Sequence, residues 1–80
     1  MSLILKPVRV ANGHDEEGML VFAGDRLVAV LVQLSDEHEE QGIAGHWFLE
    51  TGYSRPLIGE HPTFPNLDAA QAWVAARLGL

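Results

Sequence analysis

The apolar run at residues 27–34 dominates the hydrophobic pattern of this chain. It is rich in β-branched side chains and follows the turn signal Gly24-Asp25, which together favour a β-strand. Successive side chains of a strand point to opposite faces, so both faces of this strand are apolar. The pattern therefore predicts a strand whose sheet needs cover on both sides.

The first apolar segment, residues 3–10, predicts an edge strand. It is interrupted by Lys6, Pro7 and Arg9. Proline has no N–H to donate to a neighbouring strand, and charged side chains protect an edge from unwanted pairing. We therefore expect this segment at one margin of the sheet.

Two more strands complete an antiparallel meander. Residues 19–23 precede the Gly24-Asp25 turn, which predicts a tight hairpin to residues 27–34 with a positive φ at the glycine. The aromatic segment 43–51 predicts the next strand. The polar connections that we expect between these strands are residues 11–18 and 35–42.

The C-terminal segment predicts a single helix. Asn66 is a suitable N-cap, Asp68 complements the positive end of the helix dipole, and Gly79 is a stop signal. An apolar stripe at the helical period should pack on the sheet. The stripe consists of Leu67, Ala70, Val74 and Leu78 and is flanked by Trp73.

Together these elements predict an α+β domain over residues 1–80, in which an antiparallel β-meander of three to four strands carries one C-terminal α-helix on one face. Residues 52–65, with three prolines and two glycines, are expected to be mostly loop, with at most a short extended piece at Leu57-Ile58.

One helix covers one face of a sheet, so the other face is expected to meet a second copy of the chain or another protein. Ala29 and Gln33 make their face of the 27–34 strand the less apolar one, so we expect the opposite face to meet the helix. The predicted partner surface on the strand is Leu27, Ala29 and Leu31.

A second candidate interface is the alanine face of the helix, formed by Ala69, Ala72 and Ala76. Small side chains permit close approach of a partner helix. Alanine is also the best helix former and is common on exposed helices, so both interpretations stay open.

The composition limits the partners and the compartment. The chain of 80 residues has eleven acidic and five scattered basic side chains, for a net charge of −6, which disfavours nucleic acid as a partner. It has no cysteine, so a reducing cytoplasm is the expected location. No apolar run approaches the roughly 20 residues that a membrane-spanning helix needs, so we expect no membrane partner.

No catalytic motif is present, and we expect no cofactor, metal ligand or catalytic residue. The histidines lack the spacing of a zinc site, and Gly42-Ile43-Ala44-Gly45 has neither the lysine nor the helix of a phosphate-binding loop. The main interpretation is a small non-catalytic protein-interaction module that works as a homodimer or as the partner of another protein.

The alternative is a small enzyme or a binding domain for an anionic ligand that uses the 52–65 loop, in which Arg55 would recognise the anion. The candidate ligand-binding residues are His46, Trp47, Arg55, Glu60 and His61.

The order of elements and the helix opening Phe64-Pro-Asn-Leu-Asp-Ala-Ala-Gln-Ala-Trp resemble small bacterial sheet-plus-helix domains, including antitoxin-like domains of the HicB type. The resemblance covers little more than the C-terminal quarter of the chain and carries no functional residues. It implies a third function, an acidic antitoxin that neutralises a basic toxin.

Overall fold

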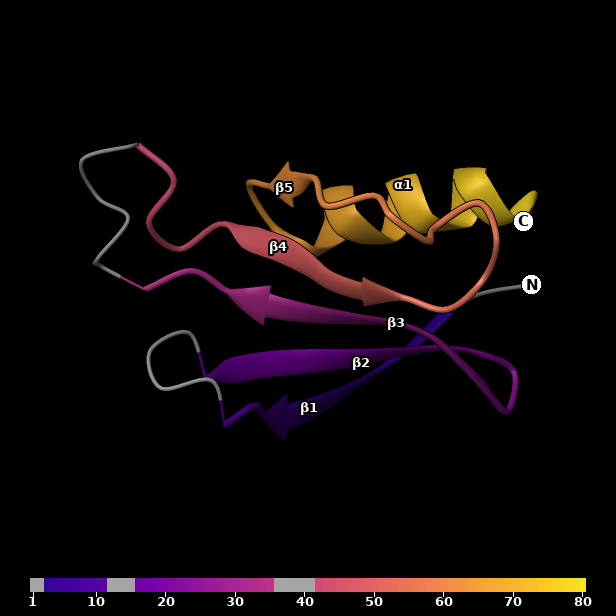
Figure 1. The fold of residues 1–80 in the computed structure, drawn as a ribbon, viewed down its shortest axis with the longest axis horizontal. Helices are drawn as coiled ribbons and strands as arrows, with labels where there is room; N and C mark the ends of the chain where they lie inside the picture. The colour runs from indigo at the N-terminus through magenta and orange to yellow at the C-terminus, as the bar shows by residue number, and fades with distance from the viewer. Residues whose placement is uncertain (1–2, 12–15, 36–41) are drawn as a thin grey trace.

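A computed structural model describes residues 3–11, 16–35 and 42–80, which form an antiparallel sheet and one helix (Figure 1). The strands lie in sequence order, β1-β2-β3-β4-β5, and every neighbouring pair is antiparallel. The predicted α+β meander with a C-terminal helix is therefore confirmed, with a short fifth strand added. The elements are β1 (Leu3–Arg9), β2 (Glu17–Ala23), β3 (Arg26–Gln33), β4 (Trp47–Gly52), β5 (Thr63–Phe64) and α1 (Leu67–Leu78).

The first hairpins follow the sequence signals closely. β1 lies at the edge of the sheet, with Pro7 opposite Met19 of β2, as its proline predicts. The β2–β3 turn has Gly24 at φ 67°, the left-handed conformation expected of a glycine in a tight hairpin. β2 begins at Glu17, earlier than predicted, while half of the first predicted polar connection and most of the second lie outside the described residues.

Two boundaries in the second half differ from the predictions. The strand expected from residue 43 begins at Trp47, because Gly45 turns the chain at φ 81° and the His46 N–H donates to the Ile43 carbonyl at 3.0 Å. The predicted extended piece at Leu57-Ile58 is wrong, since both N–H groups donate to the Ser54 carbonyl in a helical turn.

Both ends of α1 are capped as predicted. The Ala69 N–H donates to the Asn66 side-chain oxygen at 2.8 Å, and Gly79 stops the helix at φ 76°. The Leu80 N–H donates to the Ala75 carbonyl at 2.9 Å, so carbonyls of the last turn have partners.

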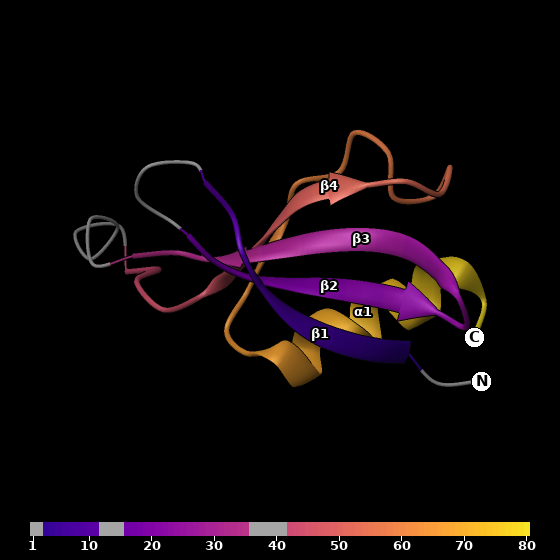
Figure 2. The ribbon, with the colours of Figure 1, turned by 90° about the horizontal axis from the view of Figure 1, so that it is seen from below.

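The core lies between the sheet and α1, which covers one face of the sheet only. In Figure 2, α1 lies behind β1, β2 and β3. Side chains from the sheet, the loop after β4 and the helix stripe form one buried cluster. Its members are Val21, Val28, Ala29, Leu31, Leu49, Leu57, Phe64, Ala70 and Val74.

The predicted orientation of β3 is therefore wrong. Ala29 and Leu31, expected on a partner surface, are 0% exposed in the core under α1. The small side chain of Ala29 fits beneath a helix. The lower hydrophobicity of this face of β3 therefore did not mean that it points away from the helix.

A β-bulge explains how the two faces of β3 divide. Val21 pairs with Ala29 and Phe22 with Leu27, so Val28 is the extra residue. Val28 consequently joins Ala29 in the core, whereas Leu27 pairs with Phe22 on the opposite face.

Candidate functional site

The face of the sheet opposite α1 is the principal candidate site, and we call it the open face. It consists of three cross-strand rows, read from the register. The rows are Ile4, Phe22 and Leu27; Lys6, Leu20, Val30 and Thr51; and Val8, Gly18, Val32 and Phe48.

Most side chains of the open face are apolar and partly exposed. Ile4 is 50% exposed, and Leu20, Phe22 and Val30 each keep part of their surface in contact with solvent. No described element packs over these side chains in the way that α1 covers the other face (Figure 2). Contiguous apolar surface of this kind is typical of protein-interaction sites.

One end of the open face is filled by the chain itself. A Cβ on Gly18 would lie 2.8 Å from Val10 Cγ2 and 3.2 Å from Val8 Cγ1, so the two valines occupy the space above this glycine. Val32, in the same row, is only 1% exposed. The exposed apolar area is therefore centred on the other two rows.

Charged residues lie at the two margins of the open face. Lys6 lies on the edge strand, and its Nζ is 5.6 Å from the centre of the Phe22 ring, within the range of a cation–π interaction. In this position the apolar part of the lysine side chain lies along the sheet. At the β4 side, the exposed Glu50 precedes Thr51 and is the extra residue of a second bulge. Lys6 and Glu50 thus have opposite signs and lie on the strands at opposite sides of the open face.

His61 borders the open face through Phe48. The two rings stack with centroids 5.7 Å apart and an angle of 15°, and His61 Nδ1 lies 2.9 Å from the Leu49 carbonyl oxygen. With Nδ1 protonated, the ring donates this hydrogen bond. The contacts hold His61 against β4 and give it a structural role.

The predicted ligand-binding residues do not form one site. Trp47 lies on the helix side, paired with Phe64 and packed against the core, while His61 stacks on the opposite side. Arg55 is exposed in the loop after β4. His46 lies just before β4, with its carbonyl accepting from the Leu34 N–H at 2.8 Å.

Glu60 is engaged with the helix. It pairs with Arg77 of α1 at 3.0 Å, and the Arg77 guanidinium lies 4.6 Å from the centre of the Trp73 ring. The pair anchors the loop after β4 to the last turn of α1, and it leaves Glu60 turned toward the helix instead of toward His46 or His61.

The predicted interface residues also separate. Leu27 lies on the open face, as its pairing with Phe22 requires. On the helix, Ala69 packs against the core, whereas Ala72 and Ala76 are exposed. The sequence pattern did not single out Ile4, Leu20 and Phe22, although the alternation within the first two strands carried the signal, nor did it single out Phe48 of β4.

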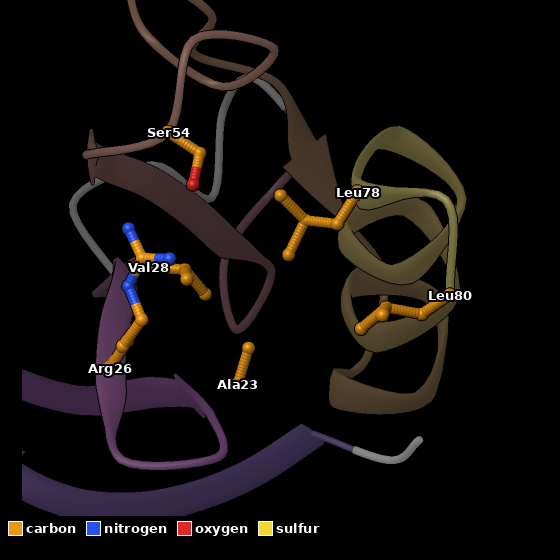
Figure 3. Close-up of a pocket in the computed structure, with 6 residues that line it drawn as sticks. All are labelled: Ala23, Arg26, Val28, Ser54, Leu78 and Leu80. Carbon is orange, nitrogen blue, oxygen red and sulfur yellow. The ribbon is translucent and has the colours of Figure 1, made fainter.

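A pocket of about 280 Å³ lies on the helix side of the sheet, at the β2–β3 turn (Figure 3). Its apolar wall comes from the strands and from the end of the helix, and its polar groups are a guanidinium and a hydroxyl. The lining residues are Ala23, Arg26, Val28, Ser54, Leu78 and Leu80.

The described residues show neither a metal cluster nor a membrane-spanning helix. Among residues 3–11, 16–35 and 42–80, no three His, Cys, Asp or Glu side chains are grouped so as to hold a metal ion. Within the same ranges, no helix has the length and apolar character to cross a membrane. Comparisons with family models, with curated proteins and with solved structures find no match to this chain.

Proposed function

We propose that this protein is a non-catalytic interaction module that associates with a second copy of itself through the open face. The observation that carries the proposal is the set of partly exposed apolar side chains on the face of the sheet that α1 does not cover. Burying this surface against a like surface would remove apolar area from water, which is the main driving force for association.

The edges of the sheet favour packing of faces over pairing of edges. β1 carries Pro7, Lys6 and Arg9, which oppose the addition of another strand, and Arg9 pairs with Glu16 at 2.9 Å. At the other margin, β5 has only the two residues Thr63–Phe64. A second copy is therefore expected to pack its sheet on this one and form layers of helix, sheet, sheet and helix.

The charges at the margins fit a second copy in one orientation. The middle row runs from Lys6 on β1 to Thr51 on β4, next to Glu50. A twofold axis parallel to the strands reverses this row, so Lys6 of each copy faces the Glu50 end of the other. The orientation makes the interface self-complementary in charge as well as in apolar surface.

The available area is consistent with a reversible dimer. The two exposed rows span roughly 20 Å across β1 to β4 and about 14 Å along the strands, at ordinary strand spacing and residue rise. Two such surfaces would bury on the order of 700 Å² in total, the size of a weak, transient interface. We therefore expect self-association in the micromolar range.

The test is the solution mass as a function of concentration. Sedimentation of the wild type from about 5 µM to about 500 µM should move from 8.8 kDa toward twice that value. Val30→Lys places a charge at the centre of the open face and should weaken the dimer by roughly 100-fold or more. In the monomer the lysine stem can reach water, so the circular dichroism spectrum should be unchanged.

The matched control is Ala72→Lys, which introduces the same charge on the exposed helix face. It should dimerise as the wild type does. A wild type that stays at 8.8 kDa throughout, or an Ala72→Lys variant that dissociates while Val30→Lys does not, would contradict the proposal.

A further inference from the structure

We infer that the pocket between the β2–β3 turn and the end of α1 binds a small amphipathic carboxylate, with the carboxylate at Arg26 and Ser54 and the apolar tail toward α1. The pocket lies on the helix side of the sheet, so this site is separate from the open face.

The polar end of the pocket is built from two elements. Arg26 begins β3, and Ser54 belongs to the loop after β4. In Figure 3 the Arg26 side chain extends toward Ser54, whose hydroxyl points into the pocket. A guanidinium and a hydroxyl on one side of a cavity are suitable donors for a carboxylate.

The charge of Arg26 is not neutralised by a described side chain. Arg9 pairs with Glu16 and Arg77 pairs with Glu60, but over residues 3–11, 16–35 and 42–80 no acidic group bonds to Arg26. Nor does any of these residues hydrogen-bond to the Ser54 hydroxyl. In a chain of net charge −6, an unpaired arginine at a pocket is a recognition group for an anion.

The opposite end of the pocket suits an apolar tail. Leu78 and Leu80 approach from the end of α1, across the pocket from Arg26, while the bulged Val28 lies on the Arg26 side (Figure 3). The C-terminal end of a helix carries partial negative charge, which would repel a carboxylate placed there. The ligand is therefore oriented with its charge at Arg26 and its tail at the two leucines.

The volume of the pocket suits a small ligand. The pocket is partly open to solvent, and its volume of about 280 Å³ corresponds to about ten non-hydrogen atoms at the density of a liquid. Octanoate has this size and chemistry and is a suitable probe. A ligand so small should bind with a Kd on the order of 1 mM.

The test is an NMR titration of the full isotope-labelled chain with octanoate. We expect the largest amide shifts around the pocket, at Ala23, Val28, Ser54 and Leu78. Arg26→Gln should raise the Kd by about fivefold or more, because a charge-assisted bond is lost. Octanol, which has the same tail without the charge, should likewise bind at least about fivefold more weakly.

Arg55→Gln is the matched control, since Arg55 is also exposed but does not line the pocket. It should leave the Kd unchanged. The inference fails if octanoate causes no shifts at a concentration about ten times the expected Kd, or if its shifts fall on Phe22 and Phe48 instead. It also fails if the Arg26→Gln variant binds octanoate, or the wild type binds octanol, as tightly as the wild type binds octanoate.

Discussion

Gly52 is required by a close approach that no side chain can share. A Cβ at this position would lie 2.5 Å from Leu57 Cβ and 2.7 Å from the Leu57 carbonyl oxygen. These are backbone-fixed atoms, so a rotamer change cannot relieve the overlap. Gly52→Ala should lower the free energy of unfolding by about 1–3 kcal/mol, measured by urea denaturation at low protein concentration.

Glu50→Ala is the control on the same strand, at an exposed position. It should change the unfolding free energy by less than about 0.5 kcal/mol. Equal stability of the two variants would mean that Gly52 has room for a methyl group.

Residue-scale signals in the sequence succeeded where they act locally. Asn66 caps the helix and Gly24 turns the hairpin, because each acts on backbone groups close to it along the chain. The need for Gly52 arises from contact with Leu57, and that contact exists only once the loop has folded back on β4. A sequence pattern does not contain such a contact.

At the scale of elements, burial should anchor the loop after β4 more strongly than its ion pair does. Leu57 is 0% exposed in the core, whereas Glu60 and Arg77 pair at the surface with side chains about half exposed, at 46% and 44%. Leu57→Ala should therefore cost about 2–5 kcal/mol of unfolding free energy, and Glu60→Gln at most about 1 kcal/mol.

Urea denaturation of the two variants, at low and at high salt, measures both effects. Salt should reduce only the smaller effect, because it screens the exposed pair. A Glu60→Gln variant as unstable as Leu57→Ala would show instead that the ion pair holds the loop.

The number and order of the main elements were predictable, but the assignment of faces was not. Hydrophobic alternation identified the strand at residues 27–34 and its two apolar sides. The bulge at Val28 interrupts the alternation, and Ala29 lies in the core because a small side chain fits beneath α1. Counting hydrophobic side chains therefore selected the wrong face for the partner.

The existence of the candidate site was predictable from the sequence, but its residues were not. A sheet face left uncovered by the helix was expected from the number of elements, and the open face has that position. Its membership depends on the register with β1, β2 and β4, which places Ile4 and Phe22 beside Leu27. The five predicted ligand-binding residues are close in sequence, but the alternation of β4 sends Trp47 and Phe48 to opposite sides.

At the scale of the whole molecule, the described helix buries only one of the two apolar faces of the sheet. Burial against α1 explains the cluster that includes Leu31, Leu49 and Val74. It leaves the apolar rows of the open face without an equivalent partner among the described elements. Association of two copies through this face would give β2 and β3 apolar contacts on both sides.

The most direct test is an isotope-filtered NMR experiment on an equal mixture of labelled and unlabelled chains, which detects only contacts between copies. The twofold arrangement predicts intermolecular contacts between the methyl groups of Leu20 and Val30, since these residues lie on neighbouring strands at the centre of the middle row. Intermolecular contacts that involve only Ala72 and Ala76 of α1, or none at about 500 µM, would contradict association through the open face.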